Sequence, residues 1–118
     1  MKNILIISGS ISNVNRVRRF LGDEYRISAT NSHENAETVL RTKPADLVIF
    51  HAGKDYSDIF AFYKDIRQNP ETENLPLIFI TDVSFIHAMS DKIEFRNAEA
   101  VGVDAGGEEL LNLTRAFL

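Results

Sequence analysis

Four short, unbroken apolar runs constrain the fold of this chain more than any other feature. They are Ile4–Ile7, Leu47–Phe50, Leu77–Ile80 and the weaker run 98–103. Continuous runs rich in β-branched residues are typical of strands buried on both faces, as in a parallel sheet covered by helices. A shorter and more polar segment, Arg26–Ala29, fits an edge strand.

The segments between these runs carry apolar residues three and four positions apart, which is the spacing of amphipathic helices. Five helices are predicted, marked by Val14, Val17 and Leu21; Ala36, Val39 and Leu40; Ile59, Phe62 and Ile66; Ile86, Met89 and Ile93; and Leu110, Leu113 and Phe117. Strands and helices therefore alternate five times. Right-handed crossovers turn that order into a doubly wound α/β sheet with helices on both faces.

Composition restricts the classes of function. The 118 residues fit one compact domain, 1–118, and the net charge of -4 has the wrong sign for a grip on nucleic acid phosphates. The chain has no cysteine, which excludes thiolate catalysis and fits a cytoplasmic protein. The first apolar run is too short for a membrane span or a signal peptide. An ending at Phe117 and Leu118 without a polar tail suggests an excised domain at least as strongly as a complete protein.

In doubly wound sheets, ligands gather beyond the carboxyl ends of the strands, at the point where the winding reverses. This rule directs attention to four groups of residues. They are 8–10 after the first strand, 51–55 after the third, 81–82 after the fourth and 103–104 after the fifth.

Four motifs, in order and in register, resemble the receiver domain of two-component response regulators over essentially the whole chain. They are KNILII, PADLVIF, NLPLIFIT and the closing GGEELLNLTRAFL. The resemblance implies a CheY-like (βα)5 fold with strand order 2-1-3-4-5. Receivers phosphorylate an aspartate at the end of strand three. They use an acidic pair after strand one to hold Mg²⁺, a Thr or Ser after strand four and a Lys after strand five.

Matching by position places His51 where the phosphoacceptor aspartate belongs, and Ser8 and Gly9 at the acidic pair. The remaining family positions are filled by Thr81 for the switch hydroxyl, Ala100 for the switch aromatic residue and Val103 for the lysine. Thr81 alone keeps the family's residue type. We therefore expect a pseudo-receiver that binds no cofactor or metal, is not an enzyme and signals through protein contacts.

The chemistry of these residues leads to the same expectation. Mg²⁺ prefers carboxylate oxygens, and Ser8, Gly9 and His51 supply none. A transferring phosphoryl group needs cations around its equatorial oxygens, and Val103 offers none. A carboxylate at Asp82 would also repel an incoming phosphoryl group. Each lost electrostatic contribution is worth about 3 kcal/mol, so transfer would be many orders of magnitude slower.

The stretch ISGSISNVNR has a second interpretation. It resembles the first loop of flavodoxin-like FMN reductases, in which a Ser-rich turn holds the flavin phosphate at a helix N-terminus. In that reading Ser8, Ser10, Ser12 and Asn13 would bind phosphate. The plainer interpretation is that Ser10 or Ser12 caps the first helix.

His51 also allows a sharper hypothesis, because an imidazole can accept phosphate or titrate near neutral pH. A metal site of His51 with Asp55, Asp82 or His87 can be drawn at the same edge. The histidines show no ligand spacing such as HxH or HExxH, however. We interpret His51 as a structural histidine.

The fourth predicted helix has apolar residues on more than one face. The surplus predicts a partner surface made of Phe85, Ile86, Met89, Ile93, Phe95, Leu111 and Leu118. The resemblance implies that an output domain or a second copy of the chain would dock on the fourth and fifth helices. The alternative, that all these residues fill the core, stays open.

Overall fold

A computed structural model describes residues 1–53, 56–92 and 95–118, and for residues 53, 56 and 88–92 it describes the backbone alone. Asp55 and Ile93 therefore lie outside the described residues, as does the side chain of Met89.

The described chain forms a five-stranded sheet in which every pair of neighbouring strands is parallel. The strands are β1 (Asn3–Ile7), β2 (Arg26–Thr30), β3 (Leu47–Gly53), β4 (Leu77–Thr81) and β5 (Ala98–Gly102). Their order is β2-β1-β3-β4-β5. The helices are α1 (Ile11–Leu21), the short 3-10 helix η1 (His33–Asn35), α2 (Ala36–Thr42), α3 (Tyr56–Gln68), α4 (Val83–Lys92) and α5 (Gly107–Phe117). The predicted doubly wound fold and its strand order are confirmed.

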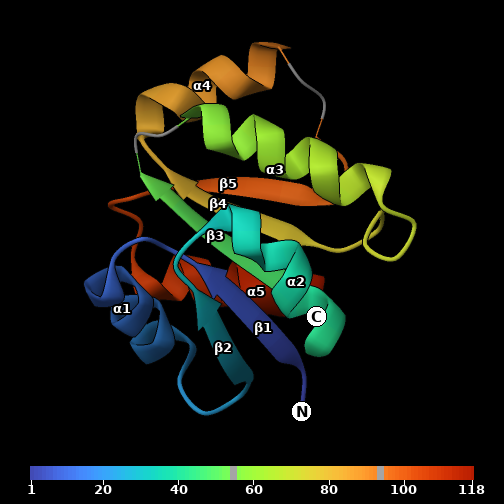
Figure 1. The fold of residues 1–118 in the computed structure, drawn as a ribbon. Coiled ribbons are helices and arrows are strands. Elements are labelled where there is room, and N and C mark those ends of the chain that lie inside the picture. Colours follow the sequence, from blue (N-terminus) through green and yellow to red (C-terminus); the bar gives the residue numbers. More distant parts are fainter. Residues whose placement is uncertain (54–55, 93–94) are drawn as a thin grey trace.

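The sheet separates two helical layers. Figure 1 shows α2, α3 and α4 on one face and α1 and α5 on the other. Along β1, Leu5 and Ile7 join the core under α2 and α3, whereas Ile4 and Ile6 join the core under α1 and α5. All four side chains are at most 1% exposed, which explains why the run is continuous. Arg26 in β2 is exposed, as expected for an edge strand.

Aromatic rings fill the layer between the sheet, α3 and α4. Phe85 is 6% exposed and meets the ring of Phe60 edge-on at 5.5 Å. Phe95 is partly buried and contacts the rings of Phe60, Tyr63 and Phe79. The ring of Phe85 therefore belongs to the core beneath α4 and not to an exposed surface, while Phe95 gives part of its surface to the same aromatic layer. On the opposite face, Leu111 and Leu118 are partly buried against the core under α1 and α5.

Two glycines mark close approaches between elements. A Cβ atom at Gly107 would overlap the ring of Phe20, so the absence of a side chain lets α5 begin against α1. A Cβ atom at Gly102 would lie 2.8 Å from Cγ2 of Val83. Both glycines therefore lie at positions where a neighbouring side chain leaves no room for a Cβ atom.

Arg67 ties three segments together at the amino end of the sheet. Its Nη1 donates to the carbonyl of Leu75 (2.8 Å) and its Nη2 donates to the carbonyl of Arg96 (2.7 Å). The guanidinium lies over the ring of Tyr63 at 5.0 Å, and the hydroxyl of Tyr63 accepts a hydrogen bond from the amide of Arg96 (2.8 Å). One cation thus joins α3 to the loops that enter β4 and β5.

None of the helices within the described ranges is long and apolar enough to cross a membrane.

We predict that Arg67→Ala lowers the free energy of unfolding by about 2 kcal/mol, because the carbonyls of Leu75 and Arg96 lose a charged hydrogen-bond donor. Urea denaturation followed by circular dichroism measures this change. Lys64→Ala, an exposed position on the same helix, is the matched control and should leave the free energy nearly unchanged. Equal effects of the two substitutions would contradict the proposed role of Arg67.

Candidate functional site: the carboxyl edge of the sheet

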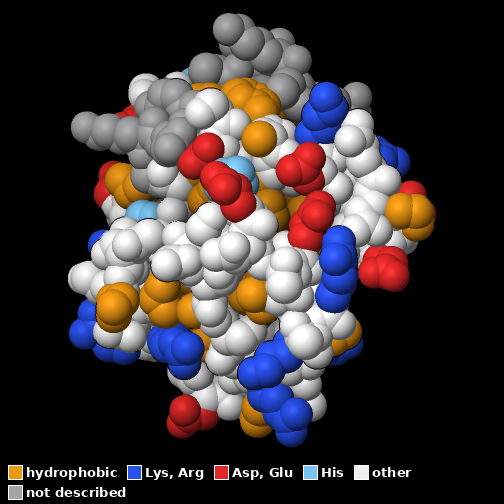
Figure 2. Space-filling view, in the orientation of Figure 1, with side chains coloured by type: hydrophobic (Ala, Val, Ile, Leu, Met, Phe, Trp, Pro, Cys, Tyr) orange, Lys and Arg blue, Asp and Glu red, His pale blue; other side chains and the backbone are white. Residues whose placement is uncertain are grey.

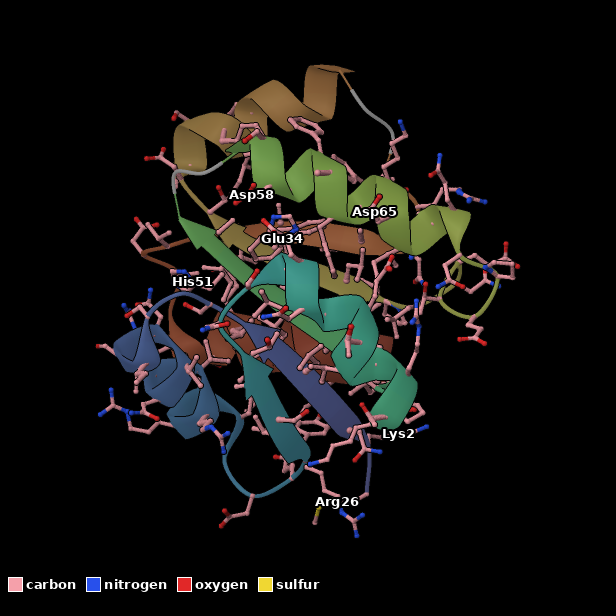
Figure 3. All side chains as sticks on the ribbon, viewed as in Figure 1. Lys2, Arg26, Glu34, His51, Asp58 and Asp65 are labelled. Carbon is pink, nitrogen blue, oxygen red and sulfur yellow. The ribbon has the colours of Figure 1, made fainter. Side chains whose placement is uncertain are left out.

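The parallel sheet brings the predicted site positions to one edge. His51 pairs in register with Ile80, one residue before Thr81 at the end of β4. The amide of Ser8 donates to the carbonyl of Thr30, and the amide of Val103 donates to the carbonyl of Thr81. Figure 3 shows His51 at this carboxyl edge, with Lys2 and Arg26 at the opposite edge.

The loop after β1 is organised as a helix cap. The hydroxyl of Ser8 is buried and accepts a hydrogen bond from the amide of Ser10 (3.2 Å). The hydroxyl of Ser10 accepts one from the amide of Asn13 (3.4 Å), which satisfies a free donor at the start of α1. The capping interpretation is therefore confirmed, with Ser10 as the capping residue.

Gly9 is exposed, and a Cβ atom there would lie 3.9 Å from the carbonyl oxygen of Asn31. A contact at that distance is ordinary van der Waals contact, so the backbone at this position has room for a side chain. The absence of a carboxylate at Gly9 is therefore a property of the sequence, and the fold does not impose it.

His51 lies half-buried at the end of β3, with its Nδ1 3.5 Å from Nδ2 of Asn13 on α1. Burial lowers the pKa of His51 below its usual value of 6.5; a backbone hydrogen bond opposes this shift and the nearby charge of Arg16 adds to it. The ring is therefore neutral at pH 7. The sequence analysis did not identify Asn13 and Arg16 as neighbours of His51. The available signal was their three-residue spacing, which places both side chains on one face of the first helix.

A cavity of about 20 Å³ lies behind His51, between the sheet, α1 and α5. Its lining consists mainly of apolar side chains and includes Phe20, Ile80, Val101, Val103 and Leu110, with Arg16 at one side. A volume of this size holds about one water molecule. The interior behind the site therefore has no room for a flavin or a phosphoryl group.

Asp82 has a local role that the sequence prediction did not assign. Its Oδ1 accepts hydrogen bonds from the amide (2.9 Å) and the hydroxyl (2.7 Å) of Ser84 at the start of α4. These contacts stabilise the first turn of that helix. An aspartate followed two residues later by a serine, directly after a strand, was a signal that could have indicated this cap.

The described residues contain no group of three or more acidic or histidine side chains placed to hold a metal ion. His87 lies exposed on α4. His33 is occupied elsewhere: its Nε2 is 3.2 Å from Oδ1 of Asp58, and its ring stacks on Phe50 at 5.7 Å.

Apolar side chains are exposed around this edge. Ile11 at the start of α1 is 79% exposed, Val83 at the start of α4 is 45% exposed and Val103 after β5 is 39% exposed. On the face seen in Figure 2, hydrophobic side chains lie exposed beside α1, while acidic ones gather higher, in front of α3. Thr81 is fully buried and Ala100 is partly buried against the aromatic layer. The carboxyl edge thus presents apolar side chains at the start of α1, at the start of α4 and after β5.

The lowered pKa of His51 predicts how stability depends on pH. Well above pH 6.5 the ring is neutral in both states and its titration does not change stability, whereas as the pH falls through 6.5 the unfolded chain binds a proton that the folded chain resists. Stability should therefore fall as the pH drops from 6.5 toward the lowered value. His51→Gln should lose less stability than the parent between about pH 7.5 and about pH 5.5 in urea titrations. A parent and His51→Gln with the same pH dependence would contradict the prediction.

Comparison with known proteins adds a curated relative and a set of solved structures. No family model matches the chain. A probable cyclic di-GMP phosphodiesterase of Vibrio cholerae is 33% identical over 81 residues, which cover 69% of this chain and 18% of that protein. The chain therefore spans about a fifth of the length of this relative.

The solved structures are similar over the whole chain. A receiver domain of a histidine kinase from Syntrophus aciditrophicus has a TM-score of 0.84, 17% identity and coverage of 100% of this chain and 90% of that one. The chemotaxis response regulator CheY4 of Vibrio cholerae has a TM-score of 0.84 and 18% identity, with 100% and 99% covered. A receiver-modulated diguanylate cyclase from Pelobacter carbinolicus has a TM-score of 0.77 and 17% identity, with 99% and 92% covered. These neighbours do not favour the flavin alternative. The chain has the CheY-like fold of response regulator receiver domains.

Proposed function

We propose that this chain is a receiver-like module of a two-component or phosphorelay-type signalling system that acts through protein binding without being phosphorylated. The observation that carries the proposal is the composition of the carboxyl edge. Ser8 and Gly9 follow β1 beside the end of β3, where His51 lies, and the exposed Val103 lines the same cavity as His51. These four side chains bring no carboxylate for Mg²⁺ and no cation for a phosphoryl group.

The environment of His51 supports a structural rather than a phosphoaccepting role. Its Nδ1 faces the amide of Asn13, and the cavity behind the ring is apolar and close to one water in volume. A phosphoryl group on the ring would need donors and cations that this lining does not offer, apart from Arg16. The exposed side chains of Ile11, Val83 and Val103 suit contact with another protein better than contact with an anion.

The output of the module is proposed from the activities for which its relatives are named. The Vibrio cholerae relative is named for cyclic di-GMP hydrolysis, and one structural neighbour is a diguanylate cyclase. We therefore take an enzyme of cyclic di-GMP turnover as the first output partner to test. We place this action in the cytoplasm, and a homodimer through α4 and α5 stays a prediction of the resemblance.

Phosphorylation assays test the proposal. The parent chain with Mg²⁺ and acetyl phosphate should gain no phosphoryl adduct in its intact mass. A variant carrying Ser8→Asp, Gly9→Asp, His51→Asp and Val103→Lys should gain one, because it restores the metal cradle, the acceptor and the cation on the same framework.

The matched control keeps His51 and carries only the other three substitutions. It should stay unmodified if His51 is not an acceptor. A stoichiometric adduct on the parent chain would overturn the proposed function, and an adduct on the control alone would assign acceptor chemistry to His51.

A further inference from the structure

We propose that the outer edge of β2 binds an acidic, extended segment of a protein partner, which adds a strand to the sheet. This inference rests on the proposed function, because it names the chemistry of a partner through which the module would act. The edge lies at the opposite end of the strand order from β5. It includes none of the residues assigned to the partner surface from sequence.

The inner side of β2 is fully engaged with β1 and its flanking residues. The amide of Arg26 donates to the carbonyl of Lys2 (2.9 Å), and the carbonyl of Thr30 accepts a hydrogen bond from the amide of Ser8 (3.1 Å). The two strands are parallel and in register along their whole length. Residues 26, 28 and 30 therefore direct their backbone groups toward β1.

The outer side of β2 carries the backbone groups of Ile27 and Ala29. The N–H and C=O of one residue in a strand point to the same side, and successive residues alternate, so these groups face away from β1. No other strand in the described parts of the chain pairs with this side. An unpaired strand edge offers donors and acceptors at a spacing that fits an added strand.

Two hollows flank this edge. The hollow beside α1 has a volume of about 470 Å³, and its lining includes Arg18 and Arg19. The hollow beside the loop that enters β3 has a volume of about 500 Å³, and its lining includes Arg26 and Lys43. Ile27 lines both hollows. Side chains of an added strand would alternate between the two sides of the sheet and so meet cations on each.

The linings carry an excess of positive charge on a chain whose net charge is -4. The four cations are exposed, and none forms an ion pair with a described residue. Asp23 is the acidic residue that lines either hollow. Figure 2 shows Lys and Arg side chains gathered over the amino ends of β1 and β2, away from the acidic ones in front of α3. Charge complementarity therefore selects a segment with Asp or Glu on both of its faces.

Two carboxylates next to the edge already have partners. Glu24 forms an ion pair with Arg115 on α5, and Oδ2 of Asp46 accepts a hydrogen bond from the amide of Asn3 (2.8 Å). These contacts hold both carboxylates away from the four cations, which stay available to a ligand.

The competing explanation is that the cations only protect the strand edge. Charged side chains commonly keep edge strands from pairing with other chains. That explanation accounts for Arg26, which lies on the strand itself. It does not account for two arginines on α1 and a lysine after α2 that border the hollows on either side.

The experiment uses capped synthetic peptides of valine and threonine. One carries glutamates that face both sides of the extended chain, and its twin carries lysines at the same positions. Each is titrated into the full chain labelled with ¹⁵N. The glutamate peptide should give saturable shifts of the amides of Ile27 and Ala29 and slow their exchange with solvent, because they gain hydrogen-bond partners. The lysine twin should do neither, and absence of these effects with the glutamate peptide would overturn the proposal.

Matched charge reversals locate the binding site. Arg19→Glu with Arg26→Glu should weaken binding of the glutamate peptide about tenfold or more, since close charge pairs are lost. Lys64→Glu with Arg96→Glu changes the net charge equally at exposed positions on α3 and before β5, and should leave the affinity unchanged. Equal weakening by the two variants would overturn the proposal, because it would show attraction to the whole chain.

A proline substitution separates strand addition from charge attraction. Ala29→Pro removes an outward donor, and an edge strand tolerates proline where its N–H faces solvent. The folded variant should lose binding although its charge is unchanged. If the variant does not fold, a glutamate peptide with N-methylated amides makes the same test, because it keeps its charge and loses its donors. Retained binding in either case would overturn the proposal.

Other occupants of the edge give different results. Dimerisation of the parent chain through β2 without peptide would make a second copy the occupant and overturn the proposal. Tighter binding of a single-stranded DNA oligonucleotide than of the glutamate peptide would overturn the choice of a protein segment.

Failure of this inference is separable from failure of the proposed function. If the parent chain is phosphorylated but the glutamate peptide still binds β2, the proposed function fails and the docking edge stands. If no peptide binds and no phosphoryl adduct forms, the docking proposal alone is overturned.

Discussion

Burial of β1 and β3 on both faces is the constraint on which the rest of the structure depends. Ile4 to Ile7 and Leu47 to Phe50 are all at most 5% exposed, because helices cover each side of the sheet. Here each strand is joined to the next by a helix that crosses over the sheet, so both faces are covered and neighbouring strands run parallel. The carboxyl ends of all five strands therefore meet at one edge. The location of a candidate site thus follows from core packing, before any side chain at the edge is considered.

The chemistry of that edge is separate from the framework that builds it. Ser10 accepts a hydrogen bond from the first turn of α1, Ser8 accepts one from the amide of Ser10, and Asp82 accepts one from the first turn of α4. Gly9 has room for a side chain that the sequence does not supply. The fold would thus tolerate a carboxylate cradle but does not need one. A framework kept by burial and helix capping can persist without phosphoryl chemistry, which is the physical basis for the proposal that the module acts by protein contact.

Much of the fold could be predicted from sequence, because continuous apolar runs and helical spacing report burial directly. Less of the site could be predicted. Phe85 appeared to be surplus on its helix, yet it is buried, because ring packing against Phe60 depends on how α3 and α4 approach each other. The contact between Asn13 and His51 joins residues 38 positions apart, and local periodicity carries no information about it. The cap at Asp82 was visible in the sequence but was interpreted only through its charge.

The most direct test of the central claim is a Mg²⁺ and beryllofluoride titration of the ¹⁵N-labelled chain, observed at the amides of Ser8, Gly9, His51 and Val103. Beryllofluoride mimics a phosphoryl group and needs the same divalent ion and cation. The account predicts no saturable shift at these four amides. Saturable, Mg²⁺-dependent shifts at the ends of β1 and β3 would contradict it, because they would show that the edge holds both ions without the carboxylates and the lysine.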